Sequence, residues 1–96
     1  MAAKNSLAKA LKTVRKARGL SQEAFSDVSS RTYLSSLERD LKSPTLNKLA
    51  ELCEVMGIHP MTLVALAYGG DAKGVDLLVE RVRRELAELK DASDTV

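Results

Sequence analysis

The segment 20–44 constrains the fold of this chain more than any other part, and it reads LSQEAFSDVSSRTYLSSLERDLKSP. Two apolar patterns at helical spacing follow each other in this segment, and the stretch between them is short. Ser21 is a good N-cap for the first pattern, and the second begins at Ser29 or Ser30 and ends near Arg39. Such a short connection leaves room only for a tight turn. The segment therefore predicts two short helices packed closely against each other.

Helical spacing continues through the rest of the chain. It predicts a helix over residues 5–18, a helix that Thr45 caps and Gly57 ends, and a helix of about residues 61–68 that His59 caps and Pro60 opens. Aromatic residues make up only 3% of the sequence, Ala and Leu carry most of the apolar content, and no strand pattern occurs. We therefore expect an all-α fold. In the helix after Thr45, the side chains expected to face inward are Leu46, Leu49, Ala50, Cys53 and Met56.

A different apolar pattern occupies the C-terminal part. Gly69 and Gly70 interrupt the helical spacing and begin a Gly-rich joint of residues 69–74. Residues 75–96 then predict an amphipathic helix with the alternating 4 and 3 spacing of a coiled-coil seam. We favour dimerisation through this seam over a helix that folds back on residues 1–68, which form the main domain. The seam residues are Val75, Val79, Val82, Leu86 and Leu89.

Composition and charge exclude several classes of protein. The net charge is +2, with ten Lys and Arg against six Asp and Glu in residues 1–68, and five against seven in residues 69–96. Cys53 is the only cysteine and His59 the only histidine, so we expect neither a disulfide nor a metal site. The sequence contains no paired carboxylates, activated nucleophile or phosphate-binding glycine loop. We therefore expect neither an enzyme nor a bound cofactor. The absence of a membrane span or signal-peptide core predicts a cytoplasmic protein.

An ordered series of residues gives the chain a specific resemblance to a known family. The series is Leu11, Arg15, Gly19-Leu20-Ser21-Gln22-Glu23, Tyr33-Leu34-Ser35, Leu37-Glu38-Arg39, Pro44-Thr45-Leu46, Leu49-Ala50 and Met56-Gly57-Ile58. With it the chain resembles the Cro and lambda-repressor family, also called the XRE family, over residues 5–68. The resemblance implies a five-helix, helix-turn-helix DNA-binding domain whose third helix enters the major groove.

One departure from the family pattern lies between the second and third helices. Family members usually hold a glycine and a small apolar residue there. Here residues 27–31 run straight through, about two residues shorter than is typical of the motif. We expect a tighter turn or a helix that loses half a turn, with Val28 taking over the packing of the missing apolar residue.

The resemblance also implies a division of roles around the third helix. Exposed residues of that helix would contact base edges, namely Ser30, Arg31, Thr32 and Ser36. Phosphate contacts would come from Gln22, Arg39, Lys42 and Ser43. Arg15 and Glu38 would form a structural salt bridge between the first and third helices. Arg31 is the leading candidate for specificity, because its fork fits both acceptors of a guanine.

Each of these roles has a simpler alternative. Arg31 could contact a phosphate or remain a solvated surface charge, Ser30 could serve only as a helix N-cap, and Gln22 could face solvent. The stripe formed by Lys9, Lys12 and Lys16 could lie near phosphates or be the solvated face of its helix.

Together these features predict a small homodimer that binds double-stranded DNA as a transcription regulator. Among transcription regulators, we expect a repressor that binds a palindromic operator. The fifth helix is expected to contribute Leu63, Leu66 and Ala67 to the dimer interface. An antitoxin or a restriction-modification controller protein would use the same DNA chemistry. A different class is a protein-interaction module that kept the fold without reading DNA.

Overall fold

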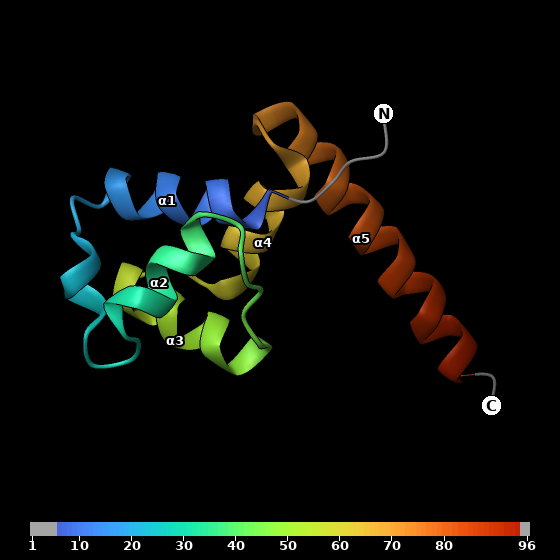
Figure 1. Cartoon of the computed structure of the whole chain (residues 1–96). Helices are drawn as coiled ribbons and strands as arrows, with labels where there is room; N and C mark the ends of the chain where they lie inside the picture. The colour runs from blue at the N-terminus through green and yellow to red at the C-terminus, as the bar shows by residue number, and fades with distance from the viewer. Residues whose placement is uncertain (1–5, 95–96) are drawn as a thin grey trace.

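The computed structural model describes residues 6–94, with side chains to residue 92, and these residues form helices and loops without a strand. The elements are α1 (Leu7–Ala17), the 3₁₀ turn η1 (Gln22–Phe25), α2 (Arg31–Glu38), α3 (Leu46–Met56), α4 (Pro60–Gly69) and α5 (Ala72–Asp94). The first five form a bundle, and α5 runs diagonally away from it (Figure 1). The predicted all-α class is confirmed.

The second helix differs most from its prediction. In place of a helix from Ser21 through Val28, the chain makes the single 3₁₀ turn η1 and then loops directly into α2. The side chain of Ser21 makes no capping hydrogen bond. The physical reason is the shortened connection, because a longer helix would leave too few residues to reach the start of α2. Phe25 is fully buried and Val28 packs against the core, which anchors the short turn.

Side-chain caps begin three of the helices. The hydroxyl of Ser30 accepts a hydrogen bond from the backbone N–H of Tyr33 at 3.0 Å at the start of α2. Thr45 caps α3 in the same way, and the Nδ1 atom of His59 accepts from the backbone N–H that follows Pro60 at 3.0 Å. These hydrogen bonds satisfy backbone donors that have no partner within the helix. The predicted caps at Thr45 and His59 are confirmed.

The end of α2 is fixed by a residue in the left-handed region. Asp40 has a φ of 60°, and its N–H donates to the carbonyl of Leu37. The N–H of Leu41 donates to the carbonyl of Ser36 at 2.9 Å, which completes a Schellman motif. Gly57 ends α3 with a φ of 71°, in the conformation that glycine adopts most readily.

The core lies between α1, α2, α3 and α4. Its buried apolar residues are Ala10, Leu11, Phe25, Leu34, Leu37, Leu49, Leu52, Cys53, Met56, Leu63 and Ala67. Two residues expected to be buried in α3 are not, because Leu46 is 83% exposed and Ala50 is also exposed. Leu46 is the first residue of its helix and lies beyond the core, and Leu52 occupies the buried face in place of Ala50.

A tight corner joins α4 to α5. Only Gly70 and Asp71 lie between the two helices, because Gly69 ends α4 and Gly74 lies inside α5. A Cβ atom on Gly74 would lie 1.9 Å from the carbonyl oxygen of Gly69, so the two backbones approach too closely for any other residue. The predicted joint of residues 69–74 is therefore mostly helical, and its glycines permit close packing. The radius of gyration is 15.4 Å, above the ~12.5 Å of a compact chain of this length, because α5 projects from the bundle.

Among the residues that the structure describes, no single helix is both long enough and apolar enough to cross a membrane. The pair α3 and α4 reaches the required length and composition only together, and it is bent by 101°.

Candidate nucleic-acid interface

Helix α2 combines a buried face with an exposed N-terminal end. Leu34 and Leu37 are buried, and they fix the helix against α1 and η1. Arg31 and Thr32 are exposed at its start, and Arg39 is exposed just beyond its end. A helix is about 10–12 Å wide with its side chains and the major groove of DNA is about 12 Å wide, so an exposed helix of this kind fits the groove.

A buried ion pair joins the end of α2 to α1. The Nε atom of Arg15 donates to Glu38 at 2.6 Å, and Nη2 donates to the other carboxylate oxygen at 3.0 Å. The third nitrogen, Nη1, donates to the carbonyl of Leu20 at 2.8 Å. The side chains of Arg15 and Glu38 are 10% and 5% exposed. The predicted salt bridge is present, and its bidentate geometry fixes the direction of α2 relative to α1.

The pKa of Glu38 is lowered from its ordinary value. Burial by itself raises the pKa, but the hydrogen bonds from Arg15 and Gln22, together with the charges of Arg15 and Lys12, outweigh that effect. The pKa of Arg15 is raised, mainly by its hydrogen bond to Glu38. Both side chains are therefore charged at neutral pH, and each compensates the buried charge of the other.

The four residues predicted to contact bases differ in how exposed their polar groups are. The hydroxyl of Ser30 already caps α2, and the hydroxyl of Ser36 donates to the carbonyl of Thr32 at 3.0 Å. Arg31 and Thr32 are exposed. The Nη1 atom of Arg31 lies 3.5 Å from a carboxylate oxygen of Glu23, which belongs to η1. The structure thus brings Arg31 and Thr32 together on one exposed end, with Glu23 beside them.

The residues predicted to contact phosphates lie in two places, with Gln22 at the start of η1 and the others at and beyond the C-terminal end of α2. Gln22 points inward, where its amide donates to Glu38 at 3.2 Å, so the donor expected at a phosphate is engaged with the ion pair. Arg39, Lys42 and Ser43 are exposed. The ammonium group of Lys42 lies 5.7 Å from the centre of the Tyr33 ring, a cation–π contact that holds it near α2. The stripe residues Lys9, Lys12 and Lys16 are also exposed.

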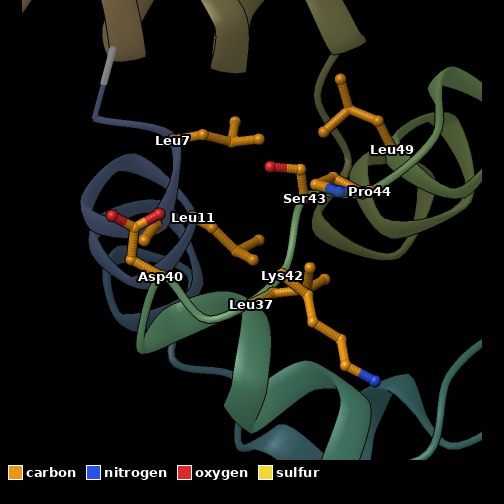
Figure 2. A pocket seen from close by; sticks show the side chains of 9 residues that line it. Leu7, Leu11, Leu37, Asp40, Lys42, Ser43, Pro44 and Leu49 are labelled. Atoms are coloured by element: carbon orange, nitrogen blue, oxygen red, sulfur yellow. The ribbon is translucent and has the colours of Figure 1, made fainter. Parts of the chain in front are cut away.

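A pocket lies between α1 and the loop after α2. Figure 2 shows Leu7, Leu11, Leu37 and Leu49 around it, and the ammonium group of Lys42 points away from these apolar side chains. Asp40, Lys42 and Ser43 supply the polar side chains of its lining. Among residues 6–94, no group of His, Cys, Asp or Glu side chains could hold a metal ion.

Sequence reasoning missed two residues near this surface. Glu23 belonged to the family-like series, yet nothing in its spacing indicated that the shortened connection would bring it beside Arg31. Lys48 donates from its Nζ atom to the carbonyl of Val28 and pairs with Glu51 at 3.0 Å, so it ties α3 to the loop before α2. The signal that could have pointed to Lys48 is the short connection between η1 and α2. Carbonyl groups in such a shortened loop need hydrogen-bond donors from other elements.

Comparison with known proteins addresses the fold and its class of function. The helix-turn-helix family model of the Cro/C1, XRE-like type matches residues 11–63, which begin within α1, include η1, α2 and α3, and extend into α4. No curated protein and no solved structure gives a significant match. The match covers more than half of the chain, and the family is one of DNA-binding regulators that recognise specific sequences. The chain therefore belongs to the Cro/C1-type helix-turn-helix family of DNA-binding proteins.

Proposed function

We propose that this protein is a homodimeric transcription repressor that acts in the cytoplasm by occupying a palindromic operator. Helix α2 enters the major groove, and repression follows because the bound dimer excludes other proteins from the same DNA. The observation that carries the proposal is the exposed end of α2, where Arg31 and Thr32 project while Arg15 and Glu38 hold the other end rigidly. A fixed recognition helix pays little entropy on binding.

The contacts are proposed as follows. Arg31 and Thr32 contact base edges, with Ser30 and Ser36 at the margin of the same surface. Phosphates on one side are contacted by Arg39, Lys42 and Ser43. On the other side, a phosphate is contacted by the amide N–H of Gln22 that does not donate to Glu38. Contacts to bases carry sequence information, whereas contacts to phosphates set position and salt dependence.

Helices α4 and α5 are the proposed dimer surface. The sequence of α4, PMTLVALAYG, is apolar on nearly every face, and such a helix requires cover on several sides. Leu63 and Ala67, expected at the dimer interface, are instead buried in the core, and Leu66 is partly buried against it. The apolar side chains left between 41% and 64% exposed on the two helices include Met61, Tyr68, Val79, Leu86 and Leu89.

The seam of α5 is divided between two environments. Val75 and Val82 are half-buried, and Val75 packs directly against the backbone of Gly69. Leu86 and Leu89 lie beyond the bundle and are 61% and 64% exposed. The proposed interface therefore uses the distal half of the predicted seam together with the outer face of α4. A second copy supplies the matching surface, as two-fold binding to a palindrome requires.

DNA binding is tested with Arg31→Ala on a site obtained by in vitro selection from random duplexes. We expect affinity for that site to fall about 5-fold to 150-fold, the equivalent of one bidentate base contact, with little change on unrelated DNA. Arg84→Ala is the matched control, since Arg84 is an exposed arginine on α5. Equal losses on selected and unrelated DNA would reduce Arg31 to a phosphate contact.

Dimerisation is tested with Leu86→Gln, measured by sedimentation equilibrium. The matched control is Leu77→Gln, because Leu77 is equally exposed at 63% and lies nine residues away, about half a turn around the same helix. We expect Leu86→Gln to weaken the dimer tenfold or more, since the lost burial counts once in each copy, at about 1.5–3 kcal/mol per leucine. If Leu77→Gln weakened it equally, the proposed face of α5 would be wrong.

An antitoxin or a controller protein of a restriction-modification system would use the same surface of α2 and pass the same DNA-binding test. A protein-interaction module would instead show no preference for any selected sequence. The exposed polar end of α2 favours a DNA-binding function over a function in protein interaction alone.

A further inference from the structure

Glu23 stands beside the leading base-contact residue. Its carboxylate oxygen lies 3.5 Å from Nη1 of Arg31, and the two side chains are 74% and 73% exposed. The residues come from different elements, η1 and α2, which residues 26–30 connect. An anionic acceptor and a cationic donor are thus presented together at the exposed start of the proposed recognition helix.

The pair is weakly held and can exchange partners. An exposed ion pair contributes little to stability, because water screens it, so base edges can replace the contact at low cost. The guanidinium of Arg31 carries five N–H donors in one plane, and the carboxylate of Glu23 carries only acceptors. The two side chains side by side therefore present a fork of donors next to an acceptor.

A G·C base pair offers the complementary pattern in the major groove. Guanine presents two acceptors, N7 and O6, and its partner cytosine presents the N4 amino group as a donor on the same edge. We propose that Arg31 and Glu23 together read one G·C base pair, Arg31 on the guanine and Glu23 on the cytosine. This inference rests on the proposed function and adds a base preference and a new contact residue to it.

Other targets fit the pair less well. An A·T pair has no two adjacent acceptors for the fork of Arg31, so a bidentate contact is lost there. A phosphate would be repelled by the carboxylate of Glu23, which lies within 3.5 Å of the guanidinium. The negative neighbour thus directs Arg31 toward a base edge that has both acceptors and a donor.

The test uses the full-length protein and duplexes that carry a selected site. N4-methylcytosine places a methyl group where Glu23 would accept, and 7-deazaguanine removes the N7 acceptor of Arg31. Each modification is placed at every G·C pair of the site in turn, and affinity is measured by fluorescence anisotropy. For the wild-type protein, we expect one G·C pair at which each modification, tested separately, weakens binding about 5-fold or more.

Two variants assign the contacts. Glu23→Ala should bind N4-methylcytosine and unmodified duplexes equally while keeping its sensitivity to 7-deazaguanine, and Arg31→Ala should show the reverse. Glu54→Ala, at an exposed glutamate on α3, is the control and should behave as wild type. Circular dichroism checks that each variant is folded.

The outcomes separate this inference from the proposed function. Sequence-selective binding in which Glu23→Ala keeps the full effect of N4-methylcytosine, or in which no G·C pair responds, overturns the role of Glu23 and leaves DNA reading intact. Failure of the wild-type protein to prefer any sequence overturns both proposals.

Discussion

The bundle and the distal half of α5 carry the same kind of helical pattern in opposite environments. In α3, Leu49, Leu52 and Met56 recur at helical spacing and are 0–5% exposed. In α5, Leu86 and Leu89 recur at the same spacing and are more than 60% exposed. The comparison teaches that apolar spacing predicts which face of a helix needs cover, whereas the cover itself depends on elements far away in the sequence.

Ion pairs show the same contrast. Arg15 and Glu38 are almost fully buried, whereas Arg81 and Glu85, one turn apart on α5, are 68% and 50% exposed at a distance of 3.0 Å. The family resemblance implies the first pair, and the second joins helical neighbours four residues apart. Only the environment separates a pair that fixes two helices from one that is a minor surface contact.

The largest contrast is expected between two leucine truncations. Leu52→Ala should lower the free energy of unfolding by about 4 kcal/mol, because Leu52 is fully buried and its loss leaves a cavity. Leu89→Ala should change the unfolding of the monomer by less than about 0.5 kcal/mol. Urea unfolding followed by circular dichroism at low protein concentration measures both. Equal losses would mean that α5 folds back onto the bundle in solution.

The next contrast compares the two ion pairs. Glu38→Ala should cost about 3 kcal/mol, because it leaves the buried charge of Arg15 unpaired. Glu85→Ala, the matched change at the exposed pair, should cost no more than about 0.5 kcal/mol. The same urea titration compares them. A small cost for Glu38→Ala would show that water reaches Arg15, and the rigid attachment of α2 would have to be abandoned.

Several elements could be predicted from the sequence because their signals are local. Ser30, considered as a cap for the third helix, caps it through its own hydroxyl, and Gly57 ends α3 with a backbone that glycine favours. Arg15 and Glu38 came from the family resemblance, since nothing local links residues 23 positions apart.

Other features depend on distances that the sequence does not contain. Gln22 turns toward Glu38 because the shortened η1 brings its amide within 3.2 Å. Leu46 has the spacing of a core residue but lies at the first position of α3, beyond the reach of the other helices. The contact of Glu23 with Arg31 likewise exists only because two elements meet across the missing turn. The spacing of residues along the sequence therefore predicted the buried faces of the helices well, but it predicted the contact partners of individual side chains poorly.

Falling pH should destabilise the bundle by protonating Glu38. Because the pKa of Glu38 is lowered on folding, the ion pair contributes stability above the ordinary carboxyl pKa of 4.5, and that contribution is lost as pH falls through the lowered value. Wild type should therefore lose stability below about pH 4.5, and Glu38→Gln should lose less over the same range. Urea midpoints from pH 7 to pH 3 measure this. Parallel curves for the two proteins would contradict the assignment of that acid loss to Glu38.

The smallest effect concerns the corner that joins the two regions, and there the sign decides. If residues 69–74 were a flexible joint, Gly74→Ala would stabilise α5 by up to about 1 kcal/mol through helix propensity. In the structure, the added Cβ would lie 1.9 Å from the carbonyl oxygen of Gly69, so α4 and α5 would have to separate at a net cost of about 1 kcal/mol. Ala87→Gly, on the exposed distal half of α5, should cost about as much by propensity alone. Thermal unfolding of the three proteins decides between the two cases: a stabilised Gly74→Ala would make α5 an independent helix on a flexible joint, and a destabilised one would make its first turns part of the bundle.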